Sequence, residues 1–337
     1  MTIQRSLLWT IGLALLLSPL ATAQLADDVH VAPKVPTQKP SALADGLEVR
    51  MKPLRVDINL VLVPVNVTDA HGSPVMDLVL QDFKLFEGET EQKIQYFYSE
   101  DAPISIGLIL DFSSSMGNKL DDLREAVDEF FKNADPQDDY FVITFGNKPK
   151  LFADTTQSTA TIQARLADAK AKGNTALADA IYMGINKLRS AYYKRRALLI
   201  VSDGGDNVSR HSLGSVRRLA KEADAQIYAI NVCDAPSILF TKKLEERFGR
   251  RWLTQVTEQT GGRTIAVDNA NEIPGAASQI SMELRNQYVL GYRPSDGAND
   301  GKWRKIKVKV ARSMDAQPLQ VYHRTGYLAR KDSNQQN

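Results

Sequence analysis

The chain of 337 residues is poor in cysteine and histidine, with Cys233 as its single thiol and only four imidazoles. One cysteine excludes an intrachain disulfide framework and any cysteine-rich zinc or iron–sulfur site. An excess of one charge is also missing, because 42 Lys and Arg residues stand against 40 Asp and Glu residues, a net charge of +2. This balance gives no general attraction to nucleic acid or to anionic lipid.

Several signatures of catalysis and nucleotide binding are absent from the sequence. No Gly-x-Gly-x-x-Gly follows a predicted strand, no Walker-type phosphate loop occurs, and no Gly-x-Ser-x-Gly elbow is present. The apolar fraction of 43% and the charged fraction of 24% are those of an ordinary globular protein. Composition therefore excludes several classes of function and supports none, so the motifs must identify one.

The first 23 residues have the layout of a secretory signal peptide. Arg5 precedes an apolar run over 7–17, Ser18-Pro19 ends that run, and Ala21-Thr22-Ala23 offers a site for a signal peptidase. A retained membrane anchor is the alternative, but the run is short for a span of about 20 residues. We therefore predict export with cleavage near Ala23, to the periplasm, the cell envelope or the medium, and no membrane span in the mature protein.

The remaining chain changes character several times. An alternation of apolar strand-like runs and helical patterns predicts a doubly wound, mostly parallel α/β domain, while the flanking segments alternate like strands of antiparallel sheets. The two flanking segments are expected to pack together as one discontinuous, sandwich-like domain, and two separate β appendages are the alternative. The predicted segments are a Pro-rich linker at 24–53, β segments at 54–100 and 288–330, the α/β domain at 101–287 and a polar tail at 331–337. Cys233 falls in an apolar strand-like run, so we expect it to be buried.

Oxygen-bearing side chains follow two of the apolar strands of the predicted α/β domain. Asp111, Ser113 and Ser115 are spaced by two, so an extended strand would place them on one side. Thr175 lies in a Gly-containing loop before a predicted helix, and Asp203 follows the next long apolar strand. In an open α/β sheet the carboxyl ends of the strands form the ligand-binding edge, so these five residues should meet there.

The five side chains are all hard oxygen donors, which favour Mg²⁺, Mn²⁺ or Ca²⁺ over zinc or copper. Mg²⁺ takes about six ligands, so five protein groups leave a position open. Because hydroxyl groups neutralise no charge, the cation would favour an anionic sixth ligand from a partner, such as a Glu or Asp side chain. The alternative for the Ser and Thr residues is that they are helix N-caps.

The pattern Asp111-Phe112-Ser113-Ser114-Ser115, with Thr175 and Asp203-Gly204, resembles the metal-ion-dependent adhesion site of the von Willebrand factor type A domain. Residues 56–67, 80–83 and 288–292 look further like the bacterial von Willebrand factor type A-related proteins. The resemblance implies that Ser113 and Ser115 ligate the ion directly, that Thr175 ligates when a partner is engaged, and that the two aspartates often act through water.

The resulting hypothesis is an exported adhesion-type module, not an enzyme, that binds an acidic side chain of a protein partner and no nucleic acid. One alternative is a metal-dependent hydrolase, although the sequence offers no positioned base; a haloacid-dehalogenase-type phosphatase would need an Asp where Ser113 stands. Another is that the metal only stabilises the fold and the β domain does the binding. Asp179 and Asp206 are expected to be solvated or to cap helices, and His211 to be an ordinary loop residue. The oligomeric state and the partner's identity are not encoded in any motif.

Overall fold

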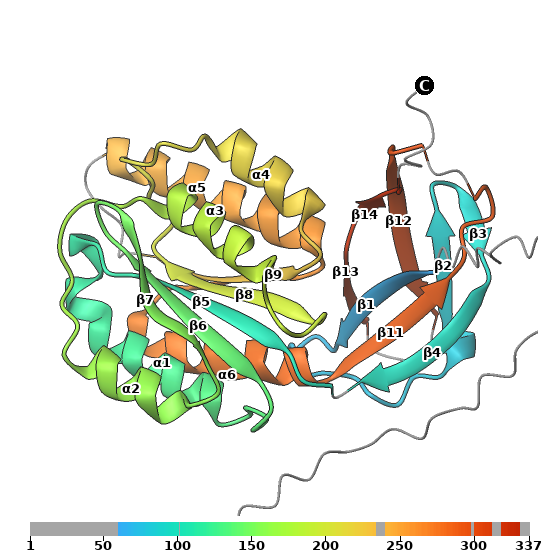
Figure 1. The fold of residues 1–337 in the computed structure, drawn as a ribbon, viewed down its shortest axis with the longest axis horizontal. Coiled ribbons are helices and arrows are strands. Elements are labelled where there is room, and N and C mark those ends of the chain that lie inside the picture. Colours follow the sequence, from blue (N-terminus) through green and yellow to red (C-terminus); the bar gives the residue numbers. More distant parts are fainter. Residues whose placement is uncertain (1–59, 101, 234–239, 298–299, 312–317, 331–337) are drawn as a thin grey trace, which may run out of the picture. The chain divides into compact units, whose positions relative to one another are not determined.

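The computed structural model describes residues 60–100, 102–233, 240–297, 300–311 and 318–330 (Figure 1). The predicted signal peptide at 1–23, the linker at 24–53 and the tail at 331–337 lie outside the described residues. Residues 56–337 form one compact unit. Among the described residues, no helix combines the length and the apolar character needed to cross a membrane.

A six-stranded sheet lies at the centre of the α/β part, in the order β10-β9-β8-β5-β6-β7. All neighbouring strands run parallel except β7, which is antiparallel to β6 and forms one edge. Every residue of β5 and β9 is buried, as expected for inner strands of a sheet covered on both faces. The strands are β5 (Ser105–Asp111), β6 (Asp139–Phe145), β7 (Pro149–Thr156), β8 (Arg196–Ser202), β9 (Gln226–Val232) and β10 (Thr264–Val267).

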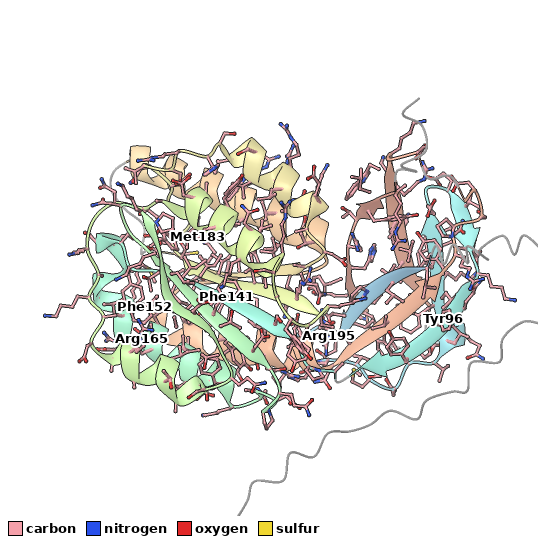
Figure 2. The ribbon with its side chains drawn as sticks, in the orientation of Figure 1. Tyr96, Phe141, Phe152, Arg165, Met183 and Arg195 are labelled. Atoms are coloured by element: carbon pink, nitrogen blue, oxygen red, sulfur yellow. The ribbon has the colours of Figure 1, made fainter. Side chains whose placement is uncertain are left out.

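Helices cover both faces of this sheet, which confirms the predicted doubly wound α/β fold. One layer holds α1 (Leu120–Phe131), α2 (Thr159–Ala167) and α6 (Ile273–Arg285), and the other holds α3 (Leu177–Leu188), α4 (Leu213–Glu222) and α5 (Phe240–Thr260) (Figure 1). Alternate strand residues face the two layers, so that Leu108 belongs to the first core and Ile109 to the second. Figure 2 labels residues on both sides of the sheet. Phe141 of β6 belongs to the core beneath α3, α4 and α5. On the other side, Arg165 of α2 lies over the ring of Phe152, with its guanidinium carbon 5.0 Å from the ring centroid.

Two antiparallel four-stranded sheets make up the rest of the unit, in the orders β13-β1-β11-β4 and β14-β12-β2-β3. Strands from before and after the α/β part pair in both sheets, and side chains of both sheets share one apolar core. The predicted discontinuous, sandwich-like arrangement is therefore confirmed. The strands are β1 (Val61–Thr68), β2 (Phe83–Glu87), β3 (Thr90–Gln92), β4 (Ile94–Glu100), β11 (Gln287–Tyr292), β12 (Trp303–Val310), β13 (Gln320–His323) and β14 (Gly326–Leu328).

Two local features differ from what the sequence pattern suggests. The strand-like segments 82–86 and 93–98 do not pair with each other, because β2 pairs with the short β3, with Leu85 opposite Gln92. The chain then changes sheets, and β4 pairs with β11 instead. Cys233 is only half-buried, because β9 ends at Val232 and the thiol lies just beyond the covered strand.

Candidate metal centre

Asp111 is the last residue of β5, an inner strand of the sheet, and its side chain is fully buried. Both carboxylate oxygens accept hydrogen bonds. The backbone N–H of Ser113 donates to Oδ1 at 2.9 Å, and the Ser202 hydroxyl donates to Oδ2 at 2.6 Å. The carboxylate is therefore fixed in orientation at the carboxyl edge of the sheet by a turn of its own chain and by the neighbouring strand β8.

The two serines of the motif are adjacent for a reason other than the one expected. The strand ends at Asp111, and a 3₁₀ helix, η2 (Ser114–Lys119), begins three residues later. This turn, not strand alternation, brings the Ser113 and Ser115 hydroxyl oxygens to 3.0 Å from each other. Ser113 is the N-cap residue of η2 but makes no side-chain capping bond, so its hydroxyl is not used as a cap.

Thr175 belongs to the loop between α2 and α3 and is 5% exposed. The loop is held against the motif by backbone bonds, from Ser114 N–H to the Gly173 carbonyl at 3.0 Å and from Ala176 N–H to the Gly146 carbonyl at 2.9 Å. Gly173 has a φ of +88°, which a residue with a side chain adopts only at a cost. The N-cap of α3 is Ala176, so the Thr175 hydroxyl is not a helix cap either.

Asp203 follows β8 directly and is buried. Its Oδ1 accepts a hydrogen bond from the Gly205 backbone N–H at 3.1 Å. A Cβ placed on Gly205 would lie 3.3 Å from Asp203 Oδ1 and 3.9 Å from Thr175 Oγ1, so both oxygens border the same small space. The structure thus joins Asp203 to Thr175, Ser202 to Asp111, and Ser113 to Ser115 at one edge of the sheet.

The electrostatics of this edge are those of two buried carboxylates close together. Burial, and then the negative charge of Asp203, raise the pKa of Asp111 to about 6, against hydrogen bonds from Ser113 and Ser202 that act to lower it. No Lys or Arg among the described residues forms a salt bridge with either carboxylate. No group of three or more His, Cys, Asp or Glu side chains gathers anywhere in the described part of the chain, and the predicted set contains only two such residues.

A hard divalent cation fits this donor set. It would bring positive charge to two buried carboxylates that lack a described cationic partner, and three hydroxyl oxygens lie beside them. The set contains no imidazole or thiolate, so zinc and copper fit less well.

Two of three polar residues near the edge have other tasks. Asp206 is the exception, because its Oδ1 is buried without a hydrogen-bond partner among the described residues, and burial raises the pKa of this carboxyl. Asp179 accepts bonds from the backbone N–H groups of Arg210 and His211, and lies 2.7 Å from Nδ1 of the His211 ring. That ring also stacks on Tyr182 with centroids 3.7 Å apart, which engages the only histidine near the site in the described chain.

Ser202 is a buried polar residue at this edge that motif reasoning missed. It is fully buried, donates to Asp111, and accepts a hydrogen bond from the Gly204 N–H at 3.1 Å. The signal was present as a lone hydroxyl between the apolar run of β8 and Asp203, in a position where an inner strand is otherwise apolar.

Comparison with known proteins agrees with this geometry. Residues 106–205 match the family described as von Willebrand factor type A domain, a segment that begins in β5 and contains all five predicted site residues. The chain therefore contains a von Willebrand factor type A domain, as the motif predicted. Domains of this family are typically interaction modules rather than enzymes. No curated protein matches the chain.

Solved structures with a similar fold come from several bacteria. BatB from Bacteroides thetaiotaomicron is 17% identical, with a TM-score of 0.42, over 53% of this chain and 98% of that one. A von Willebrand factor type A protein from Catenulispora acidiphila is 10% identical, with a TM-score of 0.46, over 74% and 76%. The vWF domain of the type V pili tip protein Mfa5 from Porphyromonas gingivalis is 12% identical, with a TM-score of 0.42, over 54% and 95%.

Proposed function

We propose that this chain is an exported binding protein that captures a protein partner through a divalent cation, Mg²⁺ or else Mn²⁺ or Ca²⁺. The residues that would hold the cation are Asp111, Ser113, Ser115, Thr175 and Asp203. The observation that carries the proposal is that the carboxylates of Asp111 and Asp203 are buried beside the hydroxyl groups of three residues, Ser113, Ser115 and Thr175. The hydroxyl groups of Ser113 and Thr175 are not used to cap a helix. The export rests on the signal-like first 23 residues, with cleavage near Ala23.

The cation, when bound, supplies a Lewis-acidic position for a carboxylate oxygen of the partner. Ser113, Ser115 and Thr175 contribute neutral oxygens, so they leave much of the cation's charge available to that carboxylate. Asp111 keeps a fixed orientation through Ser113 and Ser202, which prepares the site before any partner arrives. The proposal includes no catalytic step, and the nearby His211 is already held by Asp179 and Tyr182.

Partner capture from the secreted or envelope fraction tests this function. The wild-type protein should retain a partner in the presence of Mg²⁺, lose it on addition of EDTA, and recover it when Mg²⁺ is restored in excess. Asp111→Ala should abolish capture, while Ser114→Ala, an exposed position inside the same motif, should not.

Capture that is unaffected by both EDTA and Asp111→Ala would contradict the proposal. That result would instead favour the β sandwich as the binding surface, with the cation limited to a role in stability. Metal-dependent turnover of phosphate or peptide substrates by the purified protein would favour a hydrolase.

A further inference from the structure

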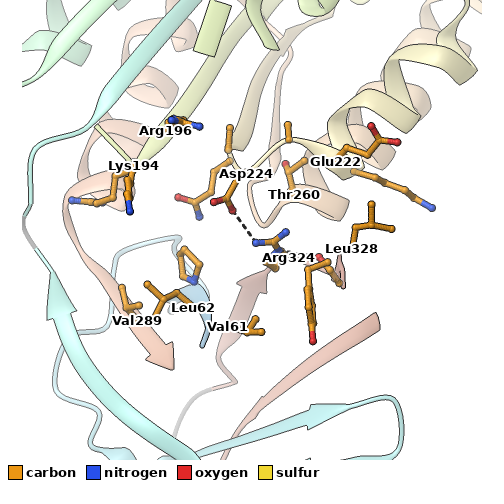
Figure 3. Close-up of a pocket in the computed structure, with 18 of the residues that line it drawn as sticks. Val61, Leu62, Lys194, Arg196, Glu222, Asp224, Thr260, Val289, Arg324 and Leu328 are labelled. Atoms are coloured by element: carbon orange, nitrogen blue, oxygen red, sulfur yellow. Dashed lines mark hydrogen bonds and ion pairs between the residues drawn. The ribbon is translucent and has the colours of Figure 1, made fainter. Parts of the chain in front are cut away.

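A second candidate site lies where the parallel strands of the six-stranded sheet begin, at the other end of these strands from the proposed metal centre. A cavity of about 610 Å³ is bordered by Arg196 and Gln226, the first residues of β8 and β9, and by residues of the antiparallel sheets (Figure 3). A strand of seven residues spans about 20 Å, so the two sites, at opposite ends of the strands, are well separated. The volume is within the range of pockets that bind small molecules, about 300–1,000 Å³.

One wall of this cavity is apolar and lies on the antiparallel sheets. Leu62 and Val289, on the paired strands β1 and β11, lie together on this wall, and Leu328 of β14 borders the cavity apart from them, near Glu222 (Figure 3). Leu62 is 43% exposed and Leu328 is 51% exposed, unusual values for large aliphatic side chains in a concave surface. The wall offers apolar area that a ligand could remove from water.

The charged residues of the lining are mostly basic, in a chain whose net charge is only +2. Six basic side chains and two acidic ones border the cavity. Asp224 is already paired with Arg324 at 3.0 Å, and the Arg195 guanidinium donates to backbone carbonyls, including that of Leu284. Lys194 and Arg196 form no salt bridge with any described carboxylate, and Figure 3 places both on the side of the cavity opposite Leu62 and Val289.

We propose that this cavity binds a small amphipathic anion, with its carboxylate or equivalent head at Lys194 and Arg196 and its apolar body against Leu62 and Val289. Charge complementarity selects the head, because the local excess of positive charge has no described carboxylate to neutralise it. The exposed Leu62 side chain, beside Val289, selects the body. The site is separate from the metal centre and does not depend on the proposed partner capture.

Calorimetric titration of the full chain with decanoate, below the concentration at which it forms micelles, tests the assignment. Decanamide is the matched neutral probe. We expect saturable binding of one decanoate per chain, with decanamide weaker by about tenfold, because the neutral amide cannot form the charge-assisted hydrogen bonds of a carboxylate with Lys194 and Arg196. EDTA should leave this binding unchanged, which separates it from the metal centre.

Two variants complete the experiment, each checked for an unchanged thermal unfolding midpoint. Lys194→Gln combined with Arg196→Gln should weaken decanoate by about tenfold and leave decanamide unaffected. Leu62→Gln should weaken both probes, and Lys150→Gln, on the distant edge strand β7, should weaken neither. Absence of saturable binding, equal affinity for the two probes, an unaffected double variant, or tighter binding of an acidic peptide than of decanoate would each overturn the proposal.

Discussion

At the scale of single residues, the proposed metal centre would depend on a hydrogen bond that lies outside the five-residue motif. Ser202 is buried, and its hydroxyl lies 2.6 Å from Asp111 Oδ2. Removal of such an outer partner typically lowers metal affinity 10–100-fold. We predict that loss for Ser202→Ala, measured by calorimetric titration with Mg²⁺.

Ser114→Ala is the control for that measurement, because Ser114 lies inside the motif but is exposed. An unchanged affinity in Ser202→Ala would mean that Asp111 is oriented without the hydroxyl, and that the bond seen here is not needed for the site.

Asp179 gives a prediction about acid stability. Burial acts to raise its pKa, but hydrogen bonds from the backbone of His211 and Arg210 and from the His211 ring together outweigh it, so the pKa is lowered below 3.8. A lowered pKa stabilises the fold above the unfolded value of about 3.9, and this contribution is lost as the pH falls through the folded value. The stability difference between the wild type and Asp179→Asn should therefore shrink on acidification from about pH 5 to about pH 2.

Denaturant unfolding at several pH values measures this difference. A constant difference for Asp179→Asn would show that its hydrogen bonds contribute no pH-dependent stability.

At the scale of elements, close packing against the central strand β5 sets the position of Asp111. A Cβ on Gly107, in the middle of β5, would lie 2.3 Å from Phe141 and 2.5 Å from Leu198. Phe141 lies in the core between the sheet and the layer that holds α3 (Figure 2). We predict that Gly107→Ala destabilises the protein by about 1–3 kcal/mol, the usual cost of overpacking a core.

Gly275 in α6 is the matched control, because nothing lies within 4 Å of the position its Cβ would take. Gly275→Ala should stabilise the protein by about 0.5–1 kcal/mol through helix propensity alone. Denaturant unfolding of both variants tests the pair, and a neutral Gly107→Ala would show that the strand has room to shift.

The elements of the α/β part could be predicted because the inner strands β5, β8 and β9 are nearly continuous apolar runs and helical patterns alternate with the strands. The same reasoning placed Asp111 and Asp203 at one edge, since both follow inner strands. The change of sheet near Lys93 could not be predicted, because β3 pairs with the adjacent β2 whereas β4 pairs with the distant β11. Sequence reasoning also failed for Ser202 and for the turn at Ser115, because both depend on contacts in space rather than on local pattern.

At the scale of the whole unit, a buried hydrogen bond joins the α/β sheet to the antiparallel sheet that contains β1. Asn66 of β1 donates through Nδ2 to the Tyr228 hydroxyl of β9 at 2.6 Å, and both side chains are buried. Tyr228→Phe would leave the buried amide without this acceptor, at a cost of about 1–3 kcal/mol. We predict that loss of stability by denaturant unfolding.

Tyr192→Phe is the control for the hydroxyl deletion, because Tyr192 is 84% exposed. If Tyr228→Phe and Tyr192→Phe were equally stable, the bond between the two sheets would contribute nothing to the fold.

The central claim is that Asp111, Asp203 and three hydroxyls hold one divalent cation, and unfolding with and without that cation tests it most directly. At a free Mg²⁺ concentration about 100 times its Kd, the wild type should be more stable than in EDTA by about 2.7 kcal/mol. Asp111→Asn, which keeps the shape of the side chain, should show no such gain. Equal gains in the two proteins, or no gain in the wild type with Mg²⁺, Mn²⁺ or Ca²⁺, would contradict the account.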